Sequence, residues 1–234
     1  MIKLIKYDFS LLTPPPAGES NTQAWLNARR GRITASKRAH MILYSRRKTL
    51  NTMMDEMAEE LKHPAEDGYS GKFTEHGHAF ESQSIGEYAM GRLTKGALNT
   101  SPGMIVHPDF DIASATPDFL EGDDTTGQAK NPFHVNNHLK LLHWGVKKTD
   151  LSYYTQVQFE SFVTGRPKIV FISYHPDATP AVNQLSIELL DRDEEMHEKF
   201  TKKLTEIEWM LANNARYNVK EKAQGIDAIP DLFV

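Results

Sequence analysis

Apolar residues recur with helical spacing in some segments of this chain and as short continuous or alternating runs in others. Met53, Met54, Met57 and Leu61 fall on one face of a predicted helix over 50–62, where the methionines are expected to fill the core. Another helix is predicted to begin after Asn21 or Thr22 and to end at Gly31. Helical spacing also predicts helices over 74–91, 134–143, 151–164 and 191–213.

The run at 169–174 is short, apolar and rich in β-branched residues, which predicts a buried central strand. The alternation over 183–190 predicts its neighbour, and shorter strands are predicted at 104–107, 111–115, 119–121 and 127–130. Thr34 or Ser36 is a candidate cap for a second helix. Strands interspersed with helices predict an α/β fold, with a central mixed sheet flanked by α-helices.

The chain is expected to form one domain over 1–234, without internal repeats. Residues 1–22 are predicted to be an N-terminal arm, because Pro14, Pro15 and Pro16 exclude a helix there. Residues 63–72 are predicted to form a loop. Residues 214–234 are expected to be a loosely held tail, although its apolar last residues, 229–234, can dock against the domain.

Composition narrows the class of protein. There is no cysteine, which excludes disulfides and thiolate metal sites and fits a cytosolic protein. No stretch reaches the ~20 apolar residues of a membrane span, and the N-terminus lacks the pattern of a secretory signal. The net charge of −4 excludes a uniformly basic surface, but local basic patches still permit nucleic-acid binding.

Candidate chemistry gathers at the ends of two predicted strands. Asp118 follows one strand, and Gln128 and Lys130 lie on the next. Positions 128 and 130 of a strand point to the same face, while position 129 points away. Asp118, Gln128 and the carbonyl of Ala129 therefore form a candidate oxygen-ligand set for Mg²⁺.

Lys130 is the candidate catalytic cation beside this set. Phosphodiester hydrolysis needs a hard cation that stabilises the developing charge and lowers the pKa of an attacking water. Lys130 is then suited to orient that water or to stabilise the transition state. The order Pro-Asp, a spacer, an acid, any residue and Lys is the signature of the PD-(D/E)xK nuclease superfamily, although the pattern alone is weak.

More of the chain resembles one family of that superfamily, the lambda-exonuclease family of phage recombination nucleases, also called YqaJ-like viral recombinases. The motifs follow one another in the family's order over roughly 24–190. They comprise Trp25, Arg29, Gly31, Ile33, Thr34, Ala35 and Ser36; Gly77 and Glu81; Thr116, Pro117 and Asp118; Lys130, Asn131, Pro132 and Phe133; and Tyr154, Gln156, Val157 and Gln158.

The resemblance implies a restriction-endonuclease-like fold and a role for each matched position. It assigns Asp118 to the metal and Lys130 to catalysis, and it adds Glu81 from the preceding helix to the active site. The residues implied to hold a 5′-phosphate are Arg29, Ser36 and Lys72. Those implied to line the site are Gln156 and Gln158, although their i, i+2 spacing leaves open that one of them packs elsewhere.

The resemblance also implies an activity and partners. We expect a Mg²⁺-dependent exodeoxyribonuclease, with Mn²⁺ as a possible substitute, that digests one strand of linear duplex DNA from 5′ to 3′. It would release 5′-mononucleotides and leave 3′ single strands for a strand-annealing partner. The family forms toroidal homotrimers, so a homotrimer ring is expected. The expected setting is the cytoplasm of a bacterial host, with the gene carried by a phage or prophage.

Gln128 departs from the family pattern, which has an acidic ligand there. A carboxamide oxygen can bind Mg²⁺ but is neutral, so metal affinity should fall. We favour an active natural variant, helped by Glu81; an engineered slow mutant and an inactive DNA-end-binding relative stay open, as does an endonuclease of the same superfamily. Asn136 also stands where the family has an arginine, and the candidate substitutes are His134, His138 and Lys140.

Other polar clusters carry weaker functional signals. Arg30 and Arg32 either join Arg29 at a phosphate or form a solvated face, and Arg46, Arg47 and Lys48 are expected to be a solvated loop. His76 and His78 are treated as non-ligands, because their spacing is poor for joint zinc binding and no third ligand lies near them in the sequence.

Overall fold

The structure is a computed structural model, and it describes residues 5–16, 22–65, 72–91 and 97–219. Two short 3₁₀ segments, η1 (Phe9–Leu11) and η2 (Ala181–Asn183), accompany the α-helices. The helices are α1 (Gln23–Arg29), α2 (Ala39–Tyr44), α3 (Arg47–Glu60), α4 (Lys72–Gly91), α5 (Val135–Trp144), α6 (Val146–Thr149), α7 (Leu151–Thr164) and α8 (Glu194–Ala212).

The strands form two sheets. The larger has the order β2-β5-β6-β7-β8, and the smaller has the order β1-β4-β3. Their bounds are β1 (Ile33–Thr34), β2 (Leu98–Asn99), β3 (Ile105–Val106), β4 (Ala113–Ala115), β5 (Phe119–Glu121), β6 (Thr125–Lys130), β7 (Lys168–Tyr174) and β8 (Leu185–Asp191). In the larger sheet β6 and β7 are parallel and the other neighbours antiparallel, so the predicted mixed sheet is confirmed.

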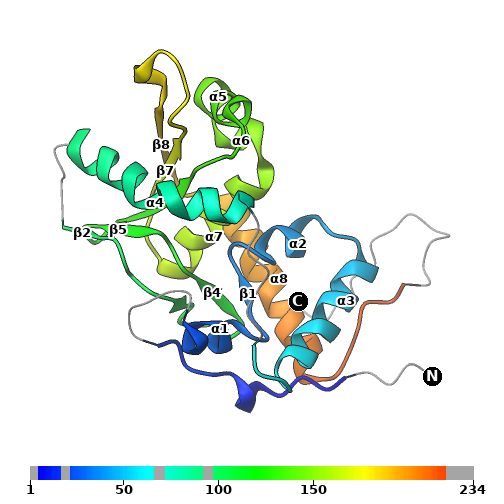
Figure 1. The fold of residues 1–234 in the computed structure, drawn as a ribbon. Coiled ribbons are helices and arrows are strands. Elements are labelled where there is room, and N and C mark those ends of the chain that lie inside the picture. The colour runs from blue at the N-terminus through cyan, green and yellow to red at the C-terminus, as the bar shows by residue number, and fades with distance from the viewer. Residues whose placement is uncertain (1–4, 17–21, 66–71, 92–96, 220–234) are drawn as a thin grey trace.

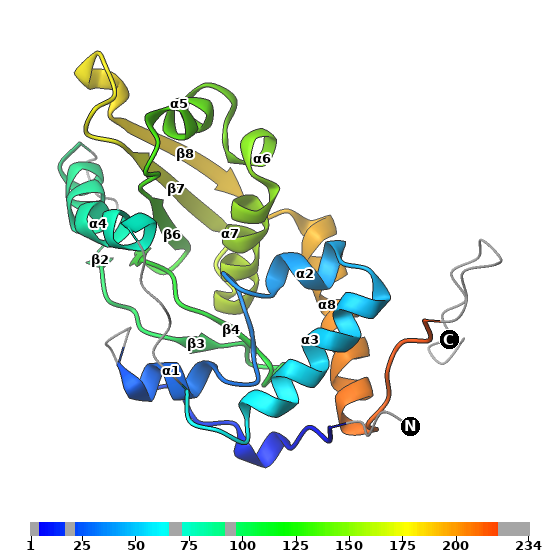
Figure 2. The ribbon, with the colours of Figure 1, turned by 45° about the vertical axis from the view of Figure 1, so that its right-hand side comes forward.

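Helices cover both faces of the five-stranded sheet (Figures 1 and 2). On one face, Ile85 and Tyr88 of α4 pack with Phe119, Ala129 and Val170. The opposite face joins the larger core, which includes Val157 of α7 and Phe200 of α8. Helix α7 contacts β6, β7 and α8, and it also contacts β4 of the smaller sheet. The centre of the sheet is thus enclosed by helices, as expected for a parallel pair.

The chain passes from β6 to the parallel strand β7 through α5, α6 and α7, because parallel strands need a crossover. Gly165, with φ +69°, ends α7 in the left-handed conformation that favours glycine. Asp150 caps the start of α7, its Oδ1 accepting from the amides of Ser152 and Tyr153. These local signals fix the helix that forms one wall of the site described below.

Most predicted elements are confirmed, with altered ends. Helix α1 begins after Thr22, one of the two predicted starting points, and Thr22 caps it. Helix α3 begins at Arg47, so the predicted loop at 46–48 is wrong for its last two residues. Strand β7 is buried as predicted, but β6 occupies the centre of the sheet. Strands β1 and β2 and helix α6 were not predicted, because each is only two to four residues long.

The prediction that Thr34 or Ser36 caps a second helix is wrong. Ile33 and Thr34 instead pair with Ala113 and Ser114 of β4, so pairing with a strand eighty residues further along the chain makes this segment extended. Helix α2 begins later, after Arg38, which makes no side-chain capping hydrogen bond.

The described residues at both ends of the chain pack against the domain more closely than predicted. Tyr7 of the arm is buried, and its hydroxyl donates to the carbonyl of Gly31 at 2.7 Å. After α8, Arg216 pairs with Asp55 at 2.7 Å and Tyr217 bonds to Asn51 of α3. The apolar residues 229–234 lie outside the described residues, as does most of the predicted loop at 63–72. None of the helices described here is long and apolar enough to cross a membrane.

Candidate active site

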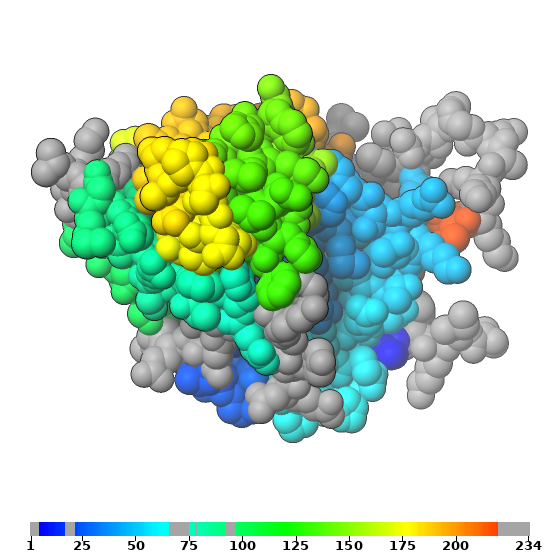
Figure 3. All heavy atoms as spheres, turned by 45° about the horizontal axis from the view of Figure 1, so that its top comes forward, coloured from blue at the N-terminus to red at the C-terminus, as the bar shows by residue number. Residues whose placement is uncertain are grey.

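A cleft of about 740 Å³ lies where β6 ends, and residues from five helices and one central strand line it. Trp25 and Arg29 come from α1, Gly77 and Glu81 from α4, and Tyr153 and Gln156 from α7. Asp118, Gln128, Ala129 and Lys130 complete the side formed by the sheet. In the space-filling view, the segment around η2 lies between α4 and α5 (Figure 3).

Asp118 lies directly before β5 and is held by the next strand. Its backbone amide donates to the carbonyl of Gly127 at 3.0 Å. Its Oδ2 accepts from the amide of Ala129 at 2.7 Å and from Nε2 of Gln128. The carboxylate is therefore fixed by main-chain geometry, as an anchor on a rigid strand end requires.

The expected alternation along β6 is present. Ala129 belongs to the core cluster on the α4 face, whereas Gln128 bonds to Gln156 on the α7 face. Lys130 is on the same face as Gln128, with Nζ 5.2 Å from the centre of the Tyr153 ring. An ammonium ion above an aromatic ring is attracted by the ring's electron-rich face, which limits where Lys130 can point. Asp118 and Lys130 thus meet in one cleft.

A chain of carboxamides links Asp118 to a second, fully buried acid. Nε2 of Gln128 donates to Asp118, and its Oε1 accepts from Nε2 of Gln156 at 3.0 Å. The same Nε2 of Gln156 donates to Oε1 of Glu160 at 2.8 Å. Glu160, one turn further along α7, is 1% exposed.

The pKa values of the two acids joined by these carboxamides, Asp118 and Glu160, are both raised. Burial raises the pKa of Asp118 to about 6; the charge of Lys130 opposes the rise and that of Glu81 adds to it. Burial, helped by the charge of Asp118, raises the pKa of Glu160 to about 8. The carboxyl groups of Asp118, Glu81 and Glu160 thus lie near a single lysine, Lys130. This end of the cleft has too little positive charge to balance them.

Arg29 and Ser36 form the second polar group in the cleft. Nη2 of Arg29 donates to Oγ of Ser36 at 3.2 Å, and the guanidinium lies 4.1 Å from the centre of the Trp25 ring. Trp25 is fixed in turn, since its Nε1 donates to Oγ1 of Thr116 at 3.2 Å. A guanidinium held by stacking presents its remaining N–H groups in a fixed geometry, which suits a phosphate.

Some predicted site residues lie elsewhere. Gln158 does not line the cleft, so it is the one of the two glutamines that packs elsewhere. It is fully buried, donates to the carbonyl of Asp191 at 3.0 Å and accepts from the amide of Asp193 at 2.9 Å, so it fixes the turn from β8 into α8. The i, i+2 spacing on a helix separates it from Gln156. Lys72 begins α4, but its side chain lies outside the described part of the structure.

The other arginines have structural contacts. Arg32 is buried and donates to the carbonyls of Asp111 and Thr13, at 2.8 and 2.9 Å. Arg30 donates to the carbonyls of Asn27 and His63. Of the three arginines around Gly31, only Arg29 lines the cleft.

The three residues considered as substitutes for the family arginine lie in different places. His134 and Lys140 line the cleft, whereas His138 is buried against Ser173 and the carbonyl of Asn183. Asn136 is exposed on α5. His76 packs against the rings of Phe80, Phe133 and His175.

Sequence reasoning missed Glu160, Trp25 and Tyr153 as parts of the site. Two of them carried a usable signal. Glu160 is an ionisable residue on an otherwise uncharged helix, four residues from Gln156, and Trp25 lies four residues before Arg29 on α1. Tyr153 is a ring platform for Lys130, a contact between segments that the sequence does not bring together.

The oxygen donors in the cleft fit Mg²⁺ better than a transition metal. Asp118, Glu81 and the carbonyl of Ala129 supply hard oxygen atoms. Among the described residues, no three or more His, Cys, Asp or Glu side chains form a cluster that could hold a metal ion. Gln128 turns its nitrogen, not its oxygen, to Asp118, so ligation by Gln128 requires its carboxamide to turn over.

Comparisons with known proteins agree with this fold. The exonuclease LHK-Exo solved with dAMP has a TM-score of 0.70 and 24% identity, over 82% of this chain and 94% of that one. The alkaline exonuclease LHK-Exo from Laribacter hongkongensis gives 0.66 and 25%, over 82% and 96%. A phage-related exonuclease from Haemophilus somnus 129PT gives 0.52 and 13%, over 91% and 96%. A search of curated proteins found no match.

The fold and the cleft define an α/β protein with a restriction-endonuclease-like core. Residues 24–167 match the model of the YqaJ-like viral recombinase domain, and the chain belongs to that family. The match spans every predicted site residue, from Arg29 to Gln158.

Proposed function

We propose that the protein is an exodeoxyribonuclease that uses Mg²⁺, or Mn²⁺ in its place, to hydrolyse one strand of linear double-stranded DNA. The observation that carries this proposal is the convergence of Asp118 and Lys130 in a cleft that also holds Arg29. Its structural neighbours are named exonucleases, and one was solved with dAMP, a deoxynucleoside monophosphate. Release of 5′-mononucleotides is the matching product class.

Asp118 and the carbonyl of Ala129 would hold the cation, with Gln128 joining them once its carboxamide turns. The bound cation supplies charge stabilisation and an acidified water. Lys130 orients the attacking water and donates to the phosphate oxygens. Glu81, which lines the same cleft from α4, would support the cation or its waters.

Arg29 and Ser36 would bind the 5′-phosphate of the digested strand. A phosphate fixed at this end of the cleft places a phosphodiester near Asp118, which favours digestion from 5′ to 3′. Lys72 is proposed to help there. This polarity leaves a 3′ single strand, the substrate of a strand-annealing partner in recombination.

Family resemblance supports three wider proposals. The protein assembles into a homotrimeric ring around DNA, hands its product to a single-strand annealing protein, and works in the cytoplasm of a bacterial host as a phage or prophage gene product. A ring explains processive digestion, because the DNA stays threaded after each cut.

A second candidate function is DNA-end binding without efficient cleavage. The contact that favours it is the hydrogen bond from Nε2 of Gln128 to Asp118, because an amide nitrogen cannot ligate a cation. In this case the Arg29 pocket binds DNA ends while the metal site stays weak.

Digestion of 5′-phosphorylated linear duplex with Mg²⁺ separates these functions. The exonuclease should release acid-soluble mononucleotides, leave closed circular DNA intact, and lose activity with EDTA or with Asp118→Ala. Binding of DNA ends without product release supports the end-binding relative. Cutting of closed circular DNA supports an endonuclease, and full activity of Asp118→Ala refutes the assigned site.

A further inference from the structure

Glu160 is a buried acid without an evident structural reason. Its Oε1 accepts from Gln156 at 2.8 Å, but its buried Oε2 has no hydrogen-bond partner. Burial of a carboxyl group with one oxygen unsatisfied is unfavourable for folding. A glutamine at 160 would accept the same hydrogen bond and add a donor, so stability alone favours the amide.

The surroundings of Oε2 are polar. Glu160 lines a hollow of about 20 Å³ together with Thr34 and Ser114, whose buried hydroxyls also lack partners. A hollow of this size has room for one water. Arg29 and Gln156 line both this hollow and the main cleft, so Glu160 lies directly behind the proposed active site.

Glu160 is also coupled to Asp118. Each of the two amide groups between them has its nitrogen directed to the next acceptor, from Gln156 to Gln128 and from Gln128 to Asp118. An ionised Glu160 favours this direction, because a carboxylate can only accept. The charge of Asp118 raises the pKa of Glu160, and a divalent cation beside Asp118 would favour ionisation of both acids.

We propose that Glu160 is a positioning residue that supplies, from helix α7, the acidic charge that Gln128 lacks on strand β6. Its negative charge stabilises a cation at Asp118 from behind Gln156 and Gln128, and it does so in either orientation of the Gln128 carboxamide. This inference rests on the proposed function. It explains how the chain keeps an acid besides Glu81 near Asp118 although position 128 is neutral.

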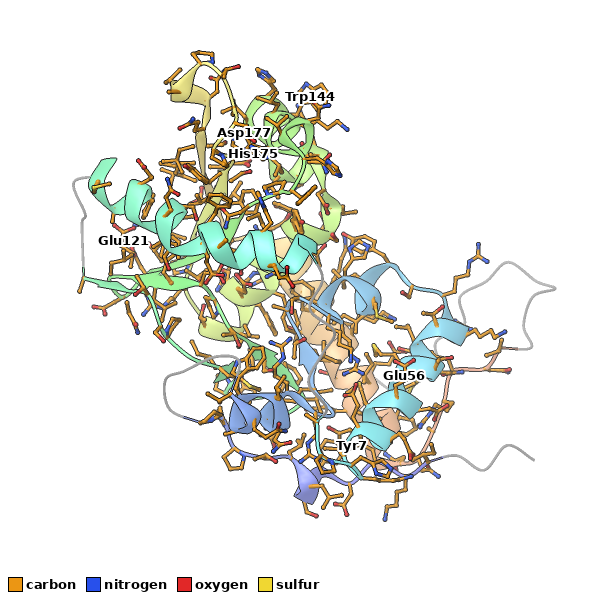
Figure 4. The ribbon with its side chains drawn as sticks, in the orientation of Figure 1. Tyr7, Glu56, Glu121, Trp144, His175 and Asp177 are labelled. Atoms are coloured by element: carbon orange, nitrogen blue, oxygen red, sulfur yellow. The ribbon has the colours of Figure 1, made fainter. Side chains whose placement is uncertain are left out.

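The test compares the wild-type protein with Glu160→Gln, with Gln128→Glu/Glu160→Gln, and with Glu121→Gln as the control. Glu121 is another buried acid, hydrogen-bonded to the hydroxyl of Tyr88 at 2.5 Å, outside the lining of the cleft (Figure 4). For each protein, calorimetry measures Mn²⁺ affinity without DNA, digestion of linear duplex gives kcat and KM, and thermal unfolding gives stability.

Glu160→Gln should unfold at the same or a higher temperature, bind Mn²⁺ about 10–100-fold more weakly and lose kcat by a similar factor, with KM for DNA unchanged. The double variant, which returns the acid to β6, should recover most of both losses. Glu121→Gln should keep the wild-type Mn²⁺ affinity.

Wild-type Mn²⁺ affinity and kcat in Glu160→Gln would overturn the proposal, as would a double variant no better than Glu160→Gln. A misfolded Glu160→Gln would also overturn it, because the amide must be tolerated if the acid is kept for function. A wild-type protein that neither binds Mn²⁺ nor digests DNA would instead contradict the proposed function, and that result is obtained before any variant is compared.

Discussion

Lys130 and Arg29 both line the cleft, and each contacts an aromatic ring, but we expect them to have different functions. Lys130 lies beside Asp118 at the end of β6, and Arg29 lies beside Ser36 at the end of α1. A point charge near the cation site acts on the reacting phosphate, whereas a planar guanidinium suits a terminal phosphate that has to be held. Their substitutions should therefore alter different kinetic constants.

Replacing Lys130 by methionine should lower kcat by about 10²–10³-fold, because it removes a charge that acts in the transition state. KM for DNA should change little. Steady-state digestion of linear duplex measures both constants. Lys202→Met, on the exposed face of α8, is the control and should digest at the wild-type rate. An unaltered kcat in Lys130→Met would remove this residue from catalysis.

Replacing Arg29 by methionine should raise KM for 5′-phosphorylated ends by about tenfold to a hundredfold, the usual effect of losing a hydrogen bond to a charged group. The wild type should prefer 5′-phosphoryl over 5′-hydroxyl ends, and the variant should digest both alike. Competition between the two kinds of end measures this preference. A preference that survives in Arg29→Met would place the phosphate elsewhere.

At the scale of elements, two tight contacts hold the site in place. Gly127 of β6 is paired with Phe119 of β5, and its missing side chain leaves room for the Phe119 ring. Helix α3 is joined to the chain before α2 by Arg38, whose guanidinium donates to both carboxyl oxygens of Glu60 at 3.0 and 2.7 Å. The first contact sets the spacing of the strands that carry Asp118 and Lys130, and the second fixes the segment that carries Ser36.

Gly127→Ala should destabilise the protein by at least about 1–3 kcal/mol, because a Cβ at 127 would lie 2.1 Å from the Phe119 ring. Thermal unfolding should show a lower melting temperature. Gly86→Ala, on α4, is the control: its Cβ meets no atom within 4 Å, and alanine is the better helix former. Equal melting temperatures for Gly127→Ala and the wild type would contradict the close approach.

Glu60→Gln should reduce stability near neutral pH and make it less sensitive to acid. Burial raises the pKa of Glu60, but Arg38, Lys37 and the amide of Gly31 outweigh it and hold that pKa at about 2. The pair therefore contributes fully above the ordinary glutamate pKa of 4.5, and its contribution is lost as the pH falls from there through about 2.

Denaturant unfolding at several pH values measures this effect. At pH 7 the variant should be roughly 3 kcal/mol less stable than the wild type, and the two should converge near pH 2. Glu59→Gln removes an exposed partner of Lys62 and should change stability little at any pH. A difference for Glu60→Gln that persists unchanged at low pH would contradict the assigned pKa.

At the scale of the whole molecule, apolar side chains remain on the surface. Trp144 at the end of α5 is 61% exposed (Figure 4). Val182 of η2 is 80% exposed, and Leu189 of the edge strand β8 is 61% exposed. Tryptophan in particular is enriched where one chain contacts another. The proposed ring gives these residues a candidate partner in a second copy of the chain.

Light scattering should therefore give three times the chain mass of 26.5 kDa at micromolar concentration. Trp144→Glu should shift the mass towards that of one chain, because a charge at an apolar contact is unfavourable. Digestion should then become distributive, with fewer nucleotides released per binding event. A wild-type mass of 26.5 kDa would remove the ring and the proposed basis of processivity.

The sequence by itself determined the residues that can carry the chemistry and most of the elements that bear them. Side-chain alternation along β6 follows from strand geometry alone, so Gln128 and Lys130 had to share a face. The cap at Thr22 and the helical spacing of the methionines of α3 were equally readable, because these signals lie within a few residues of each other.

Only the tertiary structure decided which of several similar residues reach the site. Arg29 lines the cleft, whereas Arg32 donates to the carbonyls of Thr13 and Asp111. Gln156 also lines the cleft, whereas Gln158 is hydrogen-bonded to the backbone just before α8. The role inferred for Glu160 depends on contacts with strands from distant parts of the chain. Local spacing leaves such choices open, because the competing partners are separated by tens of residues and meet only when the sheet and α7 pack together.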